Sequence, residues 1–136
     1  MDIKRLLTGT IVGGIALYAV GYLIFQLAFA EFYAANAGSA TGVNREAQLI
    51  WAVAVGNLAY AALITLGIGR STPATVGSGM TVGAVVGFLI WATADFVLYG
   101  ITNMSNLTLT VVDPLLEAVH GGIAGGVIAA VLGKMK

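Results

Sequence analysis

The sequence predicts an all-α polytopic membrane protein, with four transmembrane helices in an up-down bundle that forms one domain over residues 1–136. Composition is the first observation behind this prediction, because 59% of the residues are hydrophobic and only 9% are charged, against roughly 25% charged in a typical soluble domain. The second is that the apolar residues run continuously instead of alternating, which argues against a transmembrane β-barrel. The apolar stretches cover about 6–30, 47–69, 77–100 and 112–133.

The first two stretches satisfy the length of a membrane span, since a helix needs roughly 20 residues to cross about 30 Å of hydrocarbon. The first follows Lys4-Arg5, and its apolar run of about 24 residues exceeds the roughly 7–15 residues of a signal-peptide core. We therefore expect a permanent span. A polar, turn-rich loop at residues 36–44 separates it from the second stretch.

The last two stretches are introduced by prolines. Pro73 lies in a short loop after Arg70 and predicts a break before the third stretch. Asp113-Pro114 predicts an N-cap residue followed by proline at the first position of the fourth helix, and we interpret Asp113 as a helix cap only. The connection at residues 102–108 is polar but uncharged.

The placement of the six cationic residues predicts the orientation. In a four-span arrangement Arg45 lies alone on one side of the membrane, and the positive-inside rule assigns the opposite side to the cytoplasm. Both termini are therefore expected in the cytoplasm of a bacterium whose inner membrane holds the protein. The five cations on the cytoplasmic side are Lys4, Arg5, Arg70, Lys134 and Lys136.

Glycines at four-residue spacing predict close helix packing in lipid. The third stretch has one such row, and the fourth stretch has two that run in parallel. One interpretation is packing within the four-helix bundle. The other is that one row faces a second protomer or a subunit of a larger complex, because two rows exceed what one neighbouring helix requires. The glycines are Gly79, Gly83, Gly87, Gly121, Gly122, Gly125 and Gly126.

An ionisable residue inside a span is a candidate functional site, because a central charge costs at least about 2.5–3.5 kcal/mol. Asp95 lies in the third stretch, with Trp91 and Tyr99 four residues away on either side and hence on the same helical face. We expect this face to point into the bundle. Tyr33, Trp51 and Tyr99, near the outer surface, are interpreted as interfacial belt residues.

The fourth stretch adds Glu117 and His120, three residues apart on one face. Because the third and fourth spans run in opposite directions, this pair and Asp95 are expected at comparable depth in the outer half of the bundle. Asn57 and Gln26 are the polar side chains of the first two spans that we expect to face inward.

Three interpretations of these residues stay open. The first is a divalent metal site made of Asp95, Glu117 and His120, although the Glu-x-x-His motif of di-iron bundles occurs there in two copies. The second is a binding or permeation site for a small polar solute, a cation or a proton, with Asp95 as the central ligand. The third is structural, with Asp95 paired to His120 or hydrogen-bonded to Trp91 and Tyr99.

Signatures of an enzyme or a cofactor do not occur in this sequence: it has no nucleophile elbow, phosphate-binding loop, HExxH motif, dinucleotide fingerprint or cysteine. We therefore expect a non-enzymatic protein without a cofactor. Its expected partners are the lipid bilayer and either further copies of itself or a larger membrane complex. Nucleic acid is excluded by the lack of a basic footprint. The alternative function is an accessory or assembly subunit that docks through its glycine-rich helix faces.

One sequence pattern extends over about residues 79–133. The string Gly83-Ala-Val-Val-Gly-Phe-Leu-Ile-Trp-Ala-Thr-Ala-Asp95, a hinge with Asn103, and Leu107-Thr-Leu-Thr-Val-Val-Asp113 precede a glycine-rich last helix. This order resembles a family of small bacterial four-helix integral membrane proteins, classed as a domain of unknown function. The resemblance implies that three polar residues belong to the family pattern. These are the acid of the third helix, Asp95, the asparagine of the hinge, Asn103, and the acid that opens the fourth helix, Asp113. The sequence departs from the pattern at residues 114–117, where relatives have a bulky aromatic residue and glycine, and the resemblance implies no activity.

Overall fold

The computed structural model describes residues 1–70 and 74–135, and this part of the chain is helical with no β-strand. Its elements are α1 (Ile3–Gly21), the π-helix η1 (Tyr22–Ala28), α2 (Ala30–Ala35), α3 (Ile50–Ile68), α4 (Val76–Ile101) and α5 (Leu107–Leu132). Four segments of the described chain are long and apolar enough to cross a membrane: Ile3–Ala28, α3, α4 and α5. The predicted all-α fold with four spans is thus confirmed. The break predicted at Pro73, and the cation Lys136, lie outside the described residues.

The start of α5 differs from the prediction. The side chain of Asn106 accepts a hydrogen bond of 2.9 Å from the Leu109 N–H, so Asn106 is the N-cap and the helix begins at Leu107. The prediction that Asp113 caps this helix is therefore wrong. Pro114 lies inside the helix, where it has no N–H to donate to the preceding turn. Transmembrane helices tolerate such a proline when neighbouring groups satisfy the freed carbonyl.

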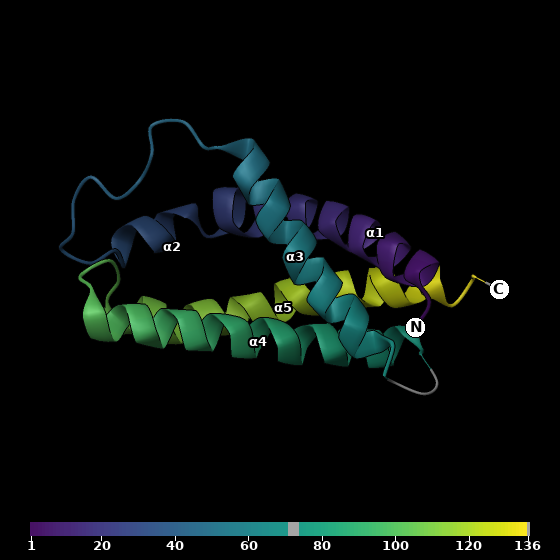
Figure 1. Ribbon diagram of the computed structural model, residues 1–136. Coiled ribbons are helices and arrows are strands. Elements are labelled where there is room, and N and C mark those ends of the chain that lie inside the picture. The colour runs from purple at the N-terminus through teal and green to yellow at the C-terminus, as the bar shows by residue number, and fades with distance from the viewer. Residues whose placement is uncertain (71–73, 136) are drawn as a thin grey trace.

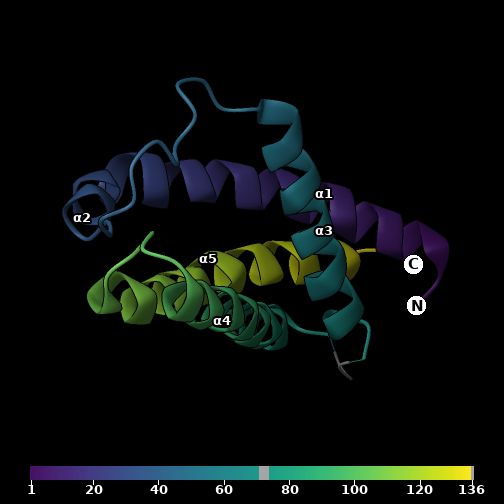
Figure 2. The ribbon, with the colours of Figure 1, turned by 60° about the vertical axis from the view of Figure 1, so that its left-hand side comes forward.

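α5 is the central helix of the structure. Figures 1 and 2 show α1, α4 and α5 running alongside one another, while α3 crosses them obliquely. α5 packs closely along α4 and also contacts α1 and α3. Its inward positions combine small residues with polar ones, and they are Thr110, Asp113, Pro114, Glu117, His120, Gly121, Gly122, Ala124, Gly125, Gly126, Ile128, Ala129 and Leu132.

Glycines bring α4 and α5 into backbone contact. A Cβ atom at Gly83 would overlap the carbonyl oxygen of Gly121, and one at Gly79 would overlap that of Gly125. The predicted packing row of α4 is therefore used within the chain. The second row of α5 faces the same neighbour, since Cβ atoms at Gly122 and Gly126 would meet Met80 and its helix. Neither row of α5 is left free for a second protomer.

The two chain ends lie at one end of the molecule (Figures 1 and 2). The Arg5 guanidinium donates a hydrogen bond of 3.1 Å to the Met135 carbonyl, and the Met1 side chain lies against Gly69 at the end of α3. Arg70 follows directly. All the cationic residues that the structure describes, apart from Arg45, therefore lie near this end of the molecule.

At the opposite end, the segment after α2 pairs with the hinge before α5. The Gly38 N–H donates to the Met104 carbonyl at 3.1 Å, and the Asn106 side-chain amide donates to the Asn36 side chain at 3.0 Å. These contacts hold the end of α2 against the start of α5, next to the polar face of that helix.

Substitution of Gly83 tests the backbone contact between α4 and α5. Gly83→Ala is expected to lower the free energy of unfolding by about 1–3 kcal/mol, because the new methyl group must push two backbones apart. Gly100→Ala, also in α4, is the matched control, since a Cβ there meets nothing within 4 Å. Denaturant titration of both variants in the same detergent measures the difference. Equal stability of the two variants would contradict the contact.

Candidate functional site

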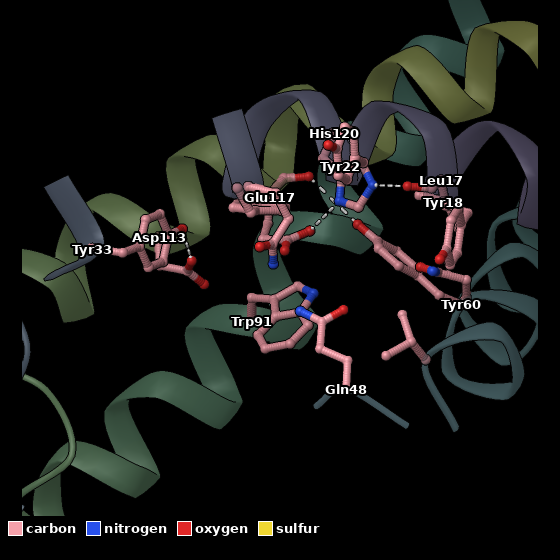
Figure 3. Close-up of a pocket in the computed structure, with 15 residues that line it drawn as sticks. Leu17, Tyr18, Tyr22, Tyr33, Gln48, Tyr60, Trp91, Asp113, Glu117 and His120 are labelled. Carbon is pink, nitrogen blue, oxygen red and sulfur yellow. Dashed lines mark hydrogen bonds and ion pairs between the residues drawn. The ribbon is translucent and has the colours of Figure 1, made fainter. Parts of the chain in front are cut away.

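A cavity of about 370 Å³ lies among α1, η1, α2, α3, the second half of α4 and the first half of α5. Figure 3 shows Asp113, Glu117 and His120 along α5, with Trp91 and Tyr60 turned toward them from α4 and α3. The lining combines ionisable, aromatic and amide side chains with few apolar ones. It consists of Asp113, Glu117, His120, Tyr18, Tyr22, Phe25, Tyr33, Tyr60, Trp91, Gln26, Gln48, Asn57, Leu17, Gly21 and Val53.

Glu117 and His120 form a hydrogen-bonded pair on α5. His120 Nδ1 lies 2.8 Å from Glu117 Oε2, and His120 Nε2 lies 2.8 Å from the Leu17 carbonyl oxygen of α1. A carbonyl can only accept, so Nε2 bears a proton and donates it. One further proton lies between Nδ1 and the carboxyl group, as imidazolium with carboxylate or as imidazole with carboxylic acid. Both arrangements have zero net charge, which suits side chains that are 4% exposed.

Three elements hold the imidazole of His120 in place. A Cβ at Gly21 would lie 3.2 Å from Nε2, so only glycine leaves the ring its room at the end of α1. The rings of Phe25 and Tyr60 meet the imidazole edge-to-face, with centroids 5.4 and 5.9 Å away. The Tyr60 hydroxyl also donates to the Glu117 carbonyl at 3.4 Å. The Glu117–His120 pair is therefore enclosed by α1, η1 and α3.

The π-helix η1 brings part of this lining into position. Its last turn is closed by a hydrogen bond of 2.8 Å from the Phe29 N–H to the Ile24 carbonyl, five residues earlier. A wider turn changes which side chains face inward, and π-helical turns frequently occur at functional sites. Tyr22, Phe25 and Gln26 reach the cavity from this segment. The sequence predicted one continuous span over residues 6–30 and did not indicate the π-helix within it.

Asp113 and Tyr33 form a second polar contact of the lining. The Tyr33 hydroxyl donates to Asp113 Oδ1, which joins α2 to α5. Asp113 is only 8% exposed, so its carboxyl group is held inside the bundle. The interpretation of Asp113 as a cap alone is wrong, because the earlier start of α5 places Asp113 inside the helix and turns it inward. Burial, followed by the hydrogen bond to Asp113, raises the pKa of Tyr33 and keeps its phenol protonated as a donor.

Asp95 and Tyr99 do not line the cavity. The Asp95 carboxyl interacts with that of Asp113, and its Oδ2 atom is buried without a hydrogen-bond partner among the described residues. Two neighbouring carboxyl groups repel each other when both are ionised. Tyr99 is 41% exposed on the outer surface of α4. Asp113, not Asp95, thus occupies the place expected for the central acid of the cavity.

A metal site finds no support in this geometry. The described residues include no group of three or more His, Asp or Glu side chains arranged to hold a metal ion. Both ring nitrogens of His120 are already engaged by Glu117 and by the Leu17 carbonyl. The interpretation that paired Asp95 with His120 is wrong for the same reason.

The structure brings together four of the six predicted site residues, namely Asn57, Trp91, Glu117 and His120. Sequence reasoning missed the roles of Asp113, Tyr33 and Tyr60. For Asp113 a signal existed, because positions 113, 117 and 120 follow the i, i+4, i+7 spacing of one helical face. For the tyrosines none existed, since their contacts join segments that are far apart along the chain.

No family model matches this chain, and neither does any curated protein or solved structure with which it was compared. The family resemblance over residues 79–133 therefore stays a prediction. The arguments on function that follow depend on the geometry of the cavity.

Replacing Tyr33 by phenylalanine tests its bond to Asp113. Tyr33→Phe is expected to lower the free energy of unfolding by about 1.5–3 kcal/mol at neutral pH, as for hydrogen bonds to charged groups. Because the folded state raises the pKa of this phenol above its usual value of about 10, the contribution is complete below that pH and declines as the pH rises beyond it. The difference between the variant and the parent protein should therefore narrow in alkaline solution. Unfolding titrations across this range measure it, with the exposed Tyr99→Phe as control.

Proposed function

We propose that this is a non-enzymatic integral membrane protein that binds a small cation or a small polar solute in the cavity beside Asp113. The observation behind the proposal is the lining itself. Within the described chain it contains an acidic side chain and a neutral Glu117–His120 pair, but neither lysine nor arginine. Such a lining attracts a cation and repels an anion.

Further features of the cavity favour a cationic group that donates hydrogen bonds. Asp95 adds a second carboxyl group beside Asp113. The side chains of Tyr22 and Trp91 line the same space, and aromatic rings can attract cations by about 0.5–2 kcal/mol. The volume also falls within the range of about 300–1,000 Å³ that is usual for small-molecule sites.

Binding explains the lining better than catalysis does. The Glu117–His120 pair could move a proton, but no serine, threonine or lysine borders the cavity in the described chain. A His–Glu pair that acts in acyl transfer needs such a nucleophile within hydrogen-bond reach of the imidazole. Here both nitrogens of His120 face other groups.

Titration with ethylammonium chloride tests the proposed function. The purified protein in lipid nanodiscs should bind ethylammonium, and Asp113→Asn should weaken binding at least about tenfold because it removes the charge but keeps an acceptor for Tyr33. Glu31→Gln is the matched control, since Glu31 is an exposed acid of α2 outside the cavity lining. Isothermal titration calorimetry gives the affinities. Lack of binding to the parent protein, or equal affinities for all three proteins, would contradict the proposal.

The proposed location is a bacterial inner membrane with both termini in the cytoplasm. The end of the molecule that holds the termini also holds Lys4, Arg5, Arg70 and Lys134, which agrees with the positive-inside rule. In this orientation the cavity lies in the outer half of the bundle. A solute would then reach it from the outer surface or from the bilayer.

Cysteine labelling tests this orientation. Because the chain has no cysteine, a single one introduced at Arg45 or at Lys134 reports one side of the membrane. Arg45→Cys is expected to react with a membrane-impermeant maleimide in intact cells, and Lys134→Cys only after the membrane is permeabilised. The reverse pattern would place the cavity in the cytoplasmic half.

A second candidate function is an accessory subunit of a larger membrane complex. The glycine rows proposed for such docking are used inside the chain. The observation that favours a partner is instead the first half of α3, where Ile50 and Trp51 are 63% and 69% exposed. A partner helix would have to pack there.

A further inference from the structure

A second hollow adjoins the cavity between α3 and α4. It has a volume of about 490 Å³ and shares Val53, Asn57, Tyr60 and Trp91 with the cavity. Its remaining lining is apolar and includes Gly56. We call this hollow the α3–α4 groove. The shared residues show that cavity and groove meet side by side, and of the two only the cavity is lined by Asp, Glu or His side chains.

The oblique course of α3 creates the α3–α4 groove. The second half of this helix is buried at Ala61, Ile64 and Ile68, whereas Trp51 and Val55 in the first half are 69% and 57% exposed. α3 therefore diverges from α4 as it is followed back toward Ile50 (Figure 1). Both helices are long and apolar enough to span a membrane, and a bilayer that they span would place the groove at the depth of the hydrocarbon.

We infer that cavity and groove form one site for a single-chain alkylamine that enters sideways from the bilayer. The ammonium group lies in the cavity beside Asp113, and the alkyl chain lies in the groove along Gly56. This inference rests on the proposed function, which supplies the site for the ammonium group, and it adds a site for the alkyl chain in the groove. A small water-soluble cation would fill the cavity and leave the groove unoccupied.

Charge and polarity favour this occupant over a second copy of the chain. A cation is complementary to the acidic side of the site, and the exposed part of α3 offers none, because residues 50–68 contain no lysine or arginine. An ammonium group on an alkyl chain supplies both the charge for Asp113 and the apolar surface for the groove. Trp91 borders both hollows and would lie where head and chain join.

Quenching of Trp91 fluorescence tests the inference. The chain has two tryptophans, so Trp51→Phe leaves Trp91 as the sole reporter. In nanodiscs, dodecylammonium with a bromine atom on its chain is expected to quench Trp91 saturably, because bromine quenches on contact. Half-quenching should occur at a mole fraction at least about tenfold lower than with the equally brominated dodecanol. Unbrominated dodecylammonium should reverse the effect.

Filling the groove supplies the matched variants in this Trp51→Phe background. Gly56→Phe is expected to raise the half-quenching mole fraction at least about tenfold, and Gly100→Phe is expected to leave it unchanged. A Cβ at either glycine meets nothing within 4 Å, so both variants should fold. Gly56→Phe should also retain ethylammonium binding, because Gly56 does not line the cavity.

The outcomes separate this inference from the proposed function. If amine and alcohol quench equally and in proportion to their mole fraction, the alkyl chain has no site, although ethylammonium binding would still support the proposed function. If ethylammonium fails to bind as well, both proposals fall. If Trp91 resists both brominated compounds and the protein is a dimer crosslinked through α3, a second copy covers the groove and the inference is overturned.

Discussion

Glycine makes the contact between α4 and α5 possible, since at Gly83 and Gly121 the backbone of each helix lies against a carbonyl oxygen of the other. Lipid supplies no hydrophobic force that would drive two apolar helices together, so association depends on close packing and on polar contacts. The glycines allow the packing on one side of α5. The polar residues Glu117 and His120 lie along an adjoining side of α5, where Tyr60 of α3 and Leu17 of α1 meet them.

The ionisable pair on that polar side, Glu117 and His120, has no net charge. His120 donates one proton to the Leu17 carbonyl and shares another with Glu117, so the pair is satisfied and uncharged as a unit whichever atom holds the shared proton. Buried charges that lack a partner are strongly unfavourable in a low-dielectric interior. Asp113 differs, because its described partners are the neutral phenol of Tyr33 and a second carboxyl group, Asp95. This excess of acidic groups is the basis of the proposed cation site.

Local signals predicted much of the fold and part of the site. Hydrophobic composition predicted four spans, and Glu117 with His120 stood out as ionisable residues in an apolar stretch. Four-residue glycine spacing predicted close helix packing, and the structure shows that α4 and α5 are the helices concerned. The cap was misjudged because Asp113-Pro114 and Asn106 are both acceptable helix starts by sequence, and the packing of the hinge against Asn36 favours the earlier one. That shift turned Asp113 from an end of the helix into its interior.

The sequence by itself determined which segments enter the membrane and which residues are too polar to face lipid, because both depend on the transfer of single side chains between water and hydrocarbon. Only the tertiary structure decided which polar groups meet. Tyr33 with Asp113, Leu17 with His120, and the oblique course of α3 join residues that are far apart along the chain. No local periodicity encodes such contacts, since they depend on how whole helices pack against one another.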